Sequence, residues 1–294
     1  MSALCWTSGR HRSVLCGFPA RGLGWAVFFF VGLWLGGCET GDDDDDSFAT
    51  PDPALENQAS YPGDFYQEIL QSELFDKLEI EVDVMEGALP TTEAEDAFQE
   101  ALDTLGETID MLCNKPGGVD FLPITTISAP ADKTEFSLED VNDLELAHRD
   151  TYWHEGTMVL YFLYLAGHSD YDDPEAGTAV VGYAYHGSSM AIFMETVNTK
   201  PALLRPSLLK TVTVHEFGHQ IGLVDNGADM QVVHDDPEHP PHCENSACMM
   251  YWLNNASSGL MDIISGEIPD FDDNCLLDIY SAGGKDARGL SQPN

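Results

Sequence analysis

The segment at residues 208–222, LLKTVTVHEFGHQIG, constrains this chain more than any other stretch. His215 and His219 are four positions apart, so on a helix their side chains lie on one face and can reach a single metal ion. Glu216 is offset around the helix, where it can address a water at the metal without binding the metal itself. Gly222 predicts the end of the helix, because glycine adopts the left-handed conformation without a side-chain penalty. The pattern His-Glu-x-x-His-x-x-Gly therefore predicts a zinc-binding helix that carries its own general base.

The first 60 residues have the composition of an export signal followed by a tether. Basic residues precede an apolar run at 22–35, which is short for a membrane span and fits a secretory signal peptide over residues 1–37. The run ends in Leu-Gly-Gly-Cys, which resembles the lipobox of bacterial lipoproteins and implies a lipid on Cys38. Residues 38–60 contain five consecutive aspartates and two prolines, a composition that predicts a disordered acidic tether. We therefore expect an exported protein that is lipid-anchored to the bacterial cell envelope, on the periplasmic or surface face of the outer membrane.

Acidic residues dominate the chain, with 51 Asp and Glu against 12 Lys and Arg and a formal net charge of −39. Phosphate binding needs a basic surface, so this charge argues against nucleic acid as a partner. It argues equally against direct binding to an anionic membrane, which leaves the lipid as the only expected membrane contact. We expect a monomer.

Four of the seven cysteines lie in the predicted folded region, at Cys113, Cys243, Cys248 and Cys275. An even number of cysteines in an exported protein favours disulfide bonds. The prediction is a local Cys243–Cys248 bridge and a long-range Cys113–Cys275 bridge. Free thiols or a zinc-bound set are the alternative.

Hydrophobic periodicity predicts one α/β domain over residues 61–284, followed by a tail at 285–294. The apolar run at 157–165 has the length and β-propensity of a buried central strand. Strands at 178–186 and 189–197 are close enough to form a hairpin, which makes one of them antiparallel to its neighbours. The other predicted elements are strands at 78–86 and 119–128, the latter interrupted by Pro123, and helices at 92–113, 137–148 and 271–281.

The central motif and the order of these elements resemble the metzincin clan of zinc endopeptidases. The resemblance implies a mixed β-sheet with an antiparallel edge strand, an active-site helix and a small irregular C-terminal subdomain with a methionine turn. It also implies that the strand at 178–186 pairs with the backbone of a protein or peptide substrate. Residues 242–250, HCENSACMM, match the His-Cys-x4-Cys-x-Met block of one family in this clan, the archaemetzincins.

Several residues are candidates for the third zinc ligand, since a catalytic zinc keeps three protein ligands and leaves a fourth position to water. His242 occupies the place of the third ligand in the archaemetzincin block and ranks first. Asp225 ranks second, because it lies three residues beyond the glycine, where the clan places its third ligand. His242 lies 17 positions beyond Asp225, and the segment between them contains two further candidates, His234 and His239.

Other features of this region extend or depart from the family pattern. Met250 resembles the methionine turn beneath the metal, whereas Trp252 stands where some clan members have a tyrosine. Archaemetzincins complete a second, structural zinc site with a later Cys-x-x-Cys, but here only Cys275 follows the block. Calcium bound by Asp235 and Asp236 is a further candidate cofactor.

The resemblance implies a zinc-dependent endopeptidase, in which a zinc-activated water attacks the peptide bond and Glu216 is the general base. One alternative is a non-catalytic surface lipoprotein that binds a metal or a partner on a degenerate metzincin fold. Another is a latent protease in which residues 47–77 act as a prosegment. A third is a helix whose histidines merely lie at the surface or pair with acidic residues.

Overall fold

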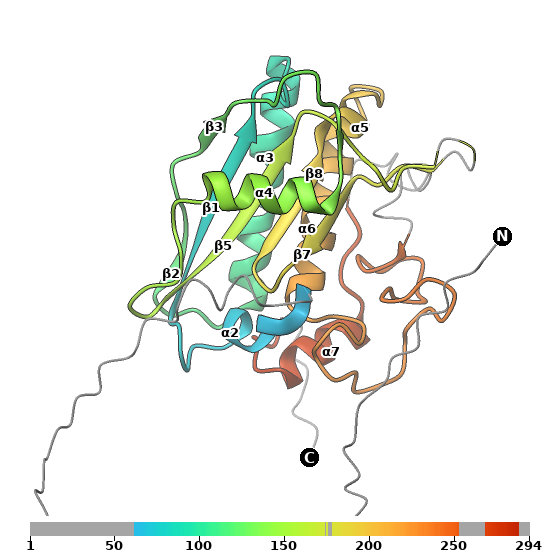
Figure 1. Cartoon of the computed structure of the whole chain (residues 1–294). Helices are drawn as coiled ribbons and strands as arrows, with labels where there is room; N and C mark the ends of the chain where they lie inside the picture. Colours follow the sequence, from blue (N-terminus) through green and yellow to red (C-terminus); the bar gives the residue numbers. More distant parts are fainter. Residues whose placement is uncertain (1–61, 174, 176–177, 253–267, 288–294) are drawn as a thin grey trace, which may run out of the picture. The chain divides into compact units, whose positions relative to one another are not determined.

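A six-stranded mixed β-sheet forms the centre of the fold (Figure 1). Its strands follow the order β2-β1-β5-β8-β7, and β3 pairs with β1 beyond the end of β2. All pairs are parallel except β7–β8, so β7 is an antiparallel edge strand. The prediction of a mixed α/β fold is confirmed. The strands are β1 (Lys77–Met85), β2 (Gly118–Phe121), β3 (Thr125–Ile127), β5 (Thr157–Leu165), β7 (Gly182–Tyr185) and β8 (Ser189–Phe193), and a separate small sheet pairs β4 (Glu135–Phe136) with β6 (His168–Ser169).

The computed structural model describes residues 62–173, 175, 178–252 and 268–287. Contacts divide the chain into two units, residues 1–46 and 47–294, and every described element belongs to the second unit. The predicted signal peptide, Cys38 and the acidic tether lie outside the described residues. No helix in the described part of the chain is both long enough and apolar enough to cross a membrane.

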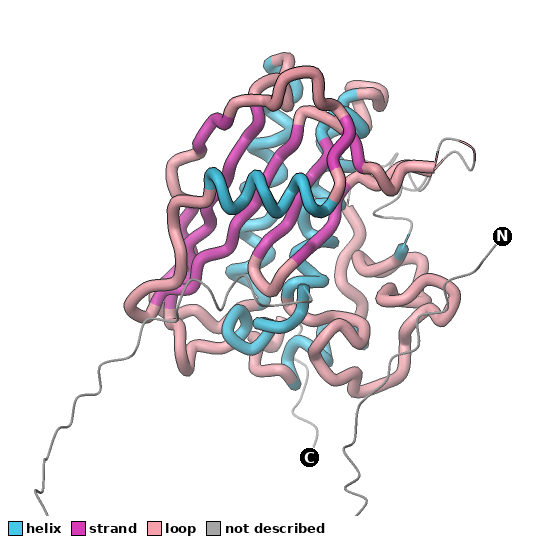
Figure 2. Tube along the Cα trace, viewed as in Figure 1, coloured by secondary structure: helices cyan, strands magenta, loops and turns pink. Residues whose placement is uncertain are grey.

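Helices cover both faces of the sheet. α3 (Thr92–Leu112) and α6 (Arg205–Gln220) pack against one face, and α4 (Leu138–His148) crosses the opposite face (Figures 1 and 2). The remaining helical segments are η1 (Pro62–Phe65), α2 (Tyr66–Leu70), α5 (Met194–Asn198) and α7 (Asp273–Ser281).

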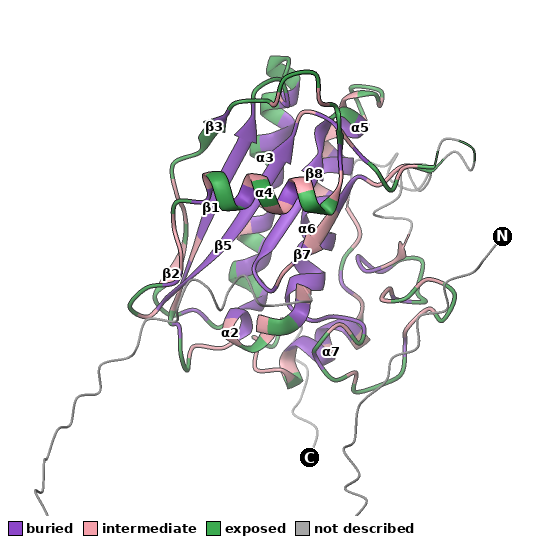
Figure 3. Ribbon diagram, viewed as in Figure 1, coloured by how far each residue is buried: buried purple, intermediate pink, exposed green. Residues whose placement is uncertain are grey.

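β5 is apolar nearly throughout because both of its faces are covered. Leu160 and Phe162 belong to the core shared with α3 and α6, whereas Tyr161 and Leu163 belong to the core under α4. All nine residues of β5 are buried, and the sheet forms the buried centre of the domain in Figure 3. The prediction of a buried central strand at 157–165 is confirmed.

The strand predicted at 178–186 is shorter, as β7 covers only Gly182–Tyr185. Three further predicted boundaries are wrong for local reasons. The strand at 189–197 ends at Phe193 and continues as α5, because its apolar residues suit a short buried helix equally well. The strand at 119–128 is divided into β2 and β3 around Pro123, which has no N–H for the ladder. The helix predicted at 208–222 begins earlier, at Arg205, and Pro206 lies in its first turn, where a missing N–H loses no hydrogen bond.

Candidate metal centre and active site

The end of α6 turns at Gly222, which has a φ of +80°. The Leu223 N–H donates to the Gly218 carbonyl at 3.1 Å, and the Gly222 N–H donates to the His219 carbonyl at 3.1 Å. This pair of bonds is a Schellman motif and ends the helix as the sequence predicts. Val224 and Asp225 then also adopt a left-handed backbone, both with a φ of 58°. The chain therefore leaves the helix abruptly and enters a long irregular loop.

Three histidine side chains converge beside this helix, and we call them the histidine centre. His215 and His219 come from α6, and His242 comes from the loop. Their ring centroids are 4.9 Å apart for His215–His219 and 5.2 Å apart for each of the other two pairs. One nitrogen from each ring lies within 4.8 Å of the corresponding nitrogen of the other two.

Hydrogen bonds fix the orientation of two of these rings. The His215 Nδ1–H donates to the Met249 carbonyl at 2.8 Å, and the His242 Nδ1–H donates to the His239 carbonyl at 2.8 Å. The Nε2 atoms of His215 and His242 and the Nδ1 atom of His219 are buried without a hydrogen-bond partner. Unpaired buried polar atoms are costly, so these three nitrogens require an explanation.

The protonation of the three rings suits a metal ion. Burial lowers the pKa of His215 to about 3, and it also lowers the pKa of His219 and of His242. All three imidazoles are therefore neutral at pH 7 and offer lone pairs. Neutral imidazoles held by a carbonyl bond at the other ring nitrogen are the usual ligands of zinc. The three residues fit a catalytic zinc ion.

Glu216 is anchored to the edge strand at one carboxylate oxygen. Its Oε2 accepts a hydrogen bond from the backbone N–H of Ala184 in β7 at 2.7 Å, whereas its Oε1 is buried without a partner. Burial raises the pKa of Glu216 to about 8, and the Ala184 N–H opposes this shift. A cation beside the carboxylate would favour the charged form. One oxygen is thus fixed while the other remains available for proton transfer.

Met250 lies directly against α6 at Gly218. A Cβ atom at Gly218 would come within 2.3 Å of the Met250 Sδ and within 3.3 Å of the Phe271 ring. The methionine is fully buried, so only glycine allows this close approach. This role of Gly218 was not predicted from the sequence, although its place inside the His-Glu-x-x-His motif gave a signal for one.

The other candidate ligands lie elsewhere in the loop. Asp225 is exposed and does not belong to the histidine centre. His239 stacks on Trp252 with ring centroids 4.0 Å apart, and its Nδ1 hydrogen-bonds to Asp236 at 2.8 Å. Neither of the two metal-type groups found in the described residues has the all-oxygen ligand set that calcium needs. Calcium at Asp235 and Asp236 therefore has no support.

The predicted disulfide bonds are not found, since none of the buried residues Cys113, Cys243, Cys248 and Cys275 forms a disulfide. Three of them gather around His234 instead. The Cys248 and Cys275 sulfurs are 3.5 Å apart, and the His234 Nδ1 lies 3.4 Å from the Cys243 sulfur. Ligand atoms of His234, Cys243, Cys275 and the Asp272 carboxylate lie within 4.8 Å of one another, and the Cys248 sulfur adjoins them at Cys275. We call His234 and the three cysteines Cys243, Cys248 and Cys275 the cysteine centre. Cys113 takes no part in it.

Hydrogen bonds from neighbouring groups make the cysteine centre suited to binding a cation. The His234 Nε2 hydrogen-bonds to the Asp278 carboxylate at 2.8 Å, an outer contact typical of metal-binding histidines. The backbone N–H groups of Met250 and Asp272 each point at the Cys248 sulfur at 3.4 Å. Hydrogen bonds from the Cys243 and Cys275 thiols lower the pKa of Cys248, and these backbone groups add to the effect. Three thiols and one imidazole are a ligand set of structural zinc.

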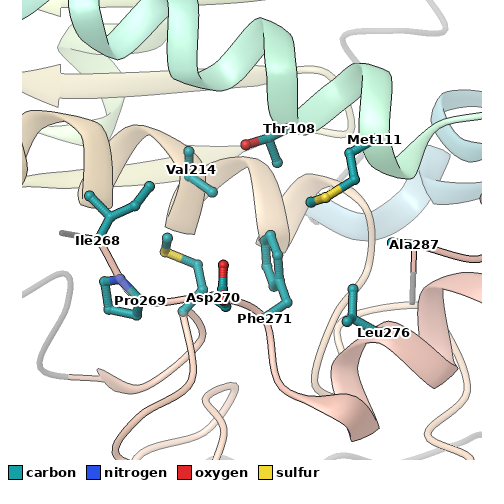
Figure 4. Close-up of a pocket in the computed structure, with 10 residues that line it drawn as sticks. Thr108, Met111, Val214, Ile268, Pro269, Asp270, Phe271, Leu276 and Ala287 are labelled. Carbon is teal, nitrogen blue, oxygen red and sulfur yellow. The ribbon is translucent and has the colours of Figure 1, made fainter.

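A small cavity of about 80 Å³ lies between α3, α6 and the residues around the start of α7 (Figure 4). Its lining includes Val214, Met111, Ile268 and Phe271, and Asp270 is its only ionisable residue. No histidine or cysteine lines this cavity, although Met249, whose carbonyl accepts the hydrogen bond from His215, does.

No protein-family model matches the chain, and no curated protein matches it either. Its fold is similar to the solved structure of archaemetzincin from Methanopyrus kandleri, with 16% sequence identity and a TM-score of 0.45 over 71% of this chain and 96% of that chain. It is also similar to archaemetzincin from Archaeoglobus fulgidus, solved in complex with malonate, with 14% identity and a TM-score of 0.40 over 69% of this chain and 99% of that chain.

Proposed function

We propose that this protein is a zinc-dependent endopeptidase whose active site is the histidine centre together with Glu216. One observation carries the proposal. Three imidazole rings converge with one nitrogen of each within 4.8 Å of a nitrogen of the other two, and the next residue along the helix from His215 is a buried carboxylate. A structural role for these rings would leave the buried Nε2 atoms of His215 and His242 unpaired, whereas metal binding satisfies both.

Glu216 is the proposed general base. A zinc ion bound by the three histidines would acidify a water and polarise the peptide carbonyl. Glu216 takes the proton from the attacking water at its free oxygen and delivers it to the leaving amine. The Ala184 N–H holds the other oxygen and so keeps the carboxylate oriented during both transfers.

An extended peptide is the proposed substrate, and β7 is the proposed place where it binds. An edge strand can accept a further strand through its backbone groups. A hollow of about 320 Å³ beside β7 supports this choice, since Leu138, Tyr171, Val180 and Tyr183 line it with mostly apolar surface. Apolar side chains of the peptide would fit there.

Two matched variants test which residue completes the zinc site. His242→Ala should lose the metal of the histidine centre and all hydrolysis of a peptide library, whereas Asp225→Ala should retain both. The measurements are metal analysis of the purified protein and cleavage with and without a chelator. Loss of metal in Asp225→Ala with retention in His242→Ala would overturn the assignment.

The non-catalytic alternative predicts that wild-type protein with a filled histidine centre cleaves no member of the library. The buried carboxylate beside the ligands does not favour this alternative. Export and a lipid on Cys38 remain part of the proposal, and mass spectrometry of the mature N-terminus tests them directly.

A further inference from the structure

The histidine centre and the cysteine centre share one short stretch of backbone. His242 of the first centre is followed immediately by Cys243 of the second. Cys248 of the second is followed immediately by Met249, whose carbonyl orients the His215 ring at 2.8 Å. Residues 242–250 therefore contribute two sulfurs to one centre and a ring and a carbonyl to the other.

No regular secondary structure holds this stretch in place. Between α6 and α7, the described residues form no α-helix and no strand of the sheet. The Cys243 N–H donates to the Met250 carbonyl at 2.8 Å and closes the stretch into a loop. The His242 carbonyl accepts a bond at 2.7 Å from the N–H of Asp236, which is itself in the irregular loop.

The firm attachments of this loop run to α7 and the residues just before it. Cys275 of α7 contacts Cys248, and Asp278 of α7 holds His234. The Met249 N–H also donates to the Asp270 carbonyl at 2.8 Å. The cysteine centre thus links the loop to α7, while the buried Met250 packs against α6.

We propose that the cysteine centre, once it has bound a metal ion, positions His242 and the Met249 carbonyl for the histidine centre. The inference rests on the function proposed above, because it concerns how tightly the histidine centre binds its own metal. Cys243 and Cys248 are positioning residues in this account, since each acts through its neighbour in the chain. Loss of such outer support typically costs 10- to 100-fold in metal affinity.

The two histidines on α6 do not depend on this link, because the helix fixes them. Without the cysteine centre, the histidine centre therefore keeps two ligands and loses the placement of the third. Linkage requires that each centre, when filled, raises the metal affinity of the other centre by the same factor. Damage to the histidine centre therefore lowers the metal affinity of the cysteine centre by that factor. The cysteine centre still stays filled, because three thiolates and an imidazole bind a metal ion tightly.

Cys275→Ser is the informative variant, and Cys113→Ser is its matched control. Cys275 belongs to the cysteine centre but is distant in sequence from His242 and Met249, and Cys113 is a buried cysteine outside both centres. Each variant is loaded with cobalt(II), whose sulfur charge-transfer absorption reports the cysteine centre alone. A chelator competition then measures the affinity of the histidine centre, and circular dichroism reports folding.

The expected result for Cys275→Ser is loss of the sulfur absorption and an affinity of the histidine centre lower by about 10- to 100-fold. Cys113→Ser should match wild type in both readouts. A Cys275→Ser protein that loses the sulfur absorption yet keeps wild-type affinity at the histidine centre would overturn the proposal. Wild-type protein without sulfur absorption would overturn it as well.

If Cys275→Ser does not fold, two further measurements decide the question. His234→Cys supplies a fourth sulfur, so it should keep the sulfur absorption and near wild-type affinity at the histidine centre. In a titration of metal-free wild-type protein, the sulfur absorption should be complete before the histidine centre fills, and the reverse order contradicts the proposal. Failure of the endopeptidase function alone would appear differently, as two filled centres without peptide cleavage.

Discussion

Gly218 connects the zinc-binding motif to the methionine beneath it, and Gly218→Ala tests that contact. The new Cβ would come within 2.3 Å of the Met250 Sδ, so the buried methionine must move. Alanine in a helix gains about 1 kcal/mol over glycine. Overpacking of a filled core costs about 1–3 kcal/mol. The second effect is the larger, so we expect a net loss of up to about 2 kcal/mol in the free energy of unfolding.

A double-mutant cycle with Met250→Ala isolates this contact. Met250→Ala alone removes a fully buried side chain and should cost about 2–5 kcal/mol. The vacated space then accepts the Cβ at position 218, so in this background Gly218→Ala should stabilise by up to about 1 kcal/mol. The change of sign corresponds to a coupling of about 1–3 kcal/mol.

The assay is urea unfolding of the metal-loaded proteins followed by circular dichroism, with equal metal content in all four. Gly106→Ala in α3 is the control, because its Cβ would approach its nearest neighbour, the Phe121 ring, only to 3.2 Å. We expect that control to change stability by less than about 1 kcal/mol. The same effect of Gly218→Ala in both backgrounds would refute the proposed contact.

Two further predictions concern other groups of the domain. Asp83 is buried against the Tyr161 hydroxyl at 2.7 Å, and burial raises its pKa to about 6. Because the pKa of Asp83 is raised in the folded state, the free energy of unfolding falls as pH rises from about 4 to 6. In urea unfolding, Asp83→Asn should therefore stabilise the protein by up to about 3 kcal/mol at pH 7 and not at all at pH 3. Equal effects of the substitution at both pH values would contradict this. Ala184→Pro removes the N–H that holds Glu216. The kcat for peptide cleavage should then fall about 10- to 100-fold while the metal content stays unchanged. An unchanged kcat would show that the contact has no role.

The sequence predicted those elements whose pattern is local. β5 and α3 follow from periodicity alone, and the end of α6 follows from Gly222, because each depends on neighbouring residues only. The strand that became α5 was misassigned, since a short apolar run suits a strand or a buried helix. Burial decided between the two.

The cysteine centre could not be predicted because it depends on tertiary contacts. Nothing in the sequence shows that α7 brings Cys275 beside Cys248, or that the loop turns His234 toward the same sulfurs. The disulfide prediction relied on the number of cysteines and on export, and both are silent about geometry. His242 was ranked first from a short sequence block, and the structure places its ring beside those of His215 and His219.

Peptide cleavage by Glu216→Gln, compared with wild type at equal metal content, tests the central claim most directly. Glutamine has nearly the same shape as glutamate but cannot accept the proton, so both centres should remain filled. General acid–base catalysis contributes about 10²- to 10⁴-fold, and we predict a loss of kcat in that range. Cleavage at the wild-type rate by fully loaded Glu216→Gln protein would contradict the account.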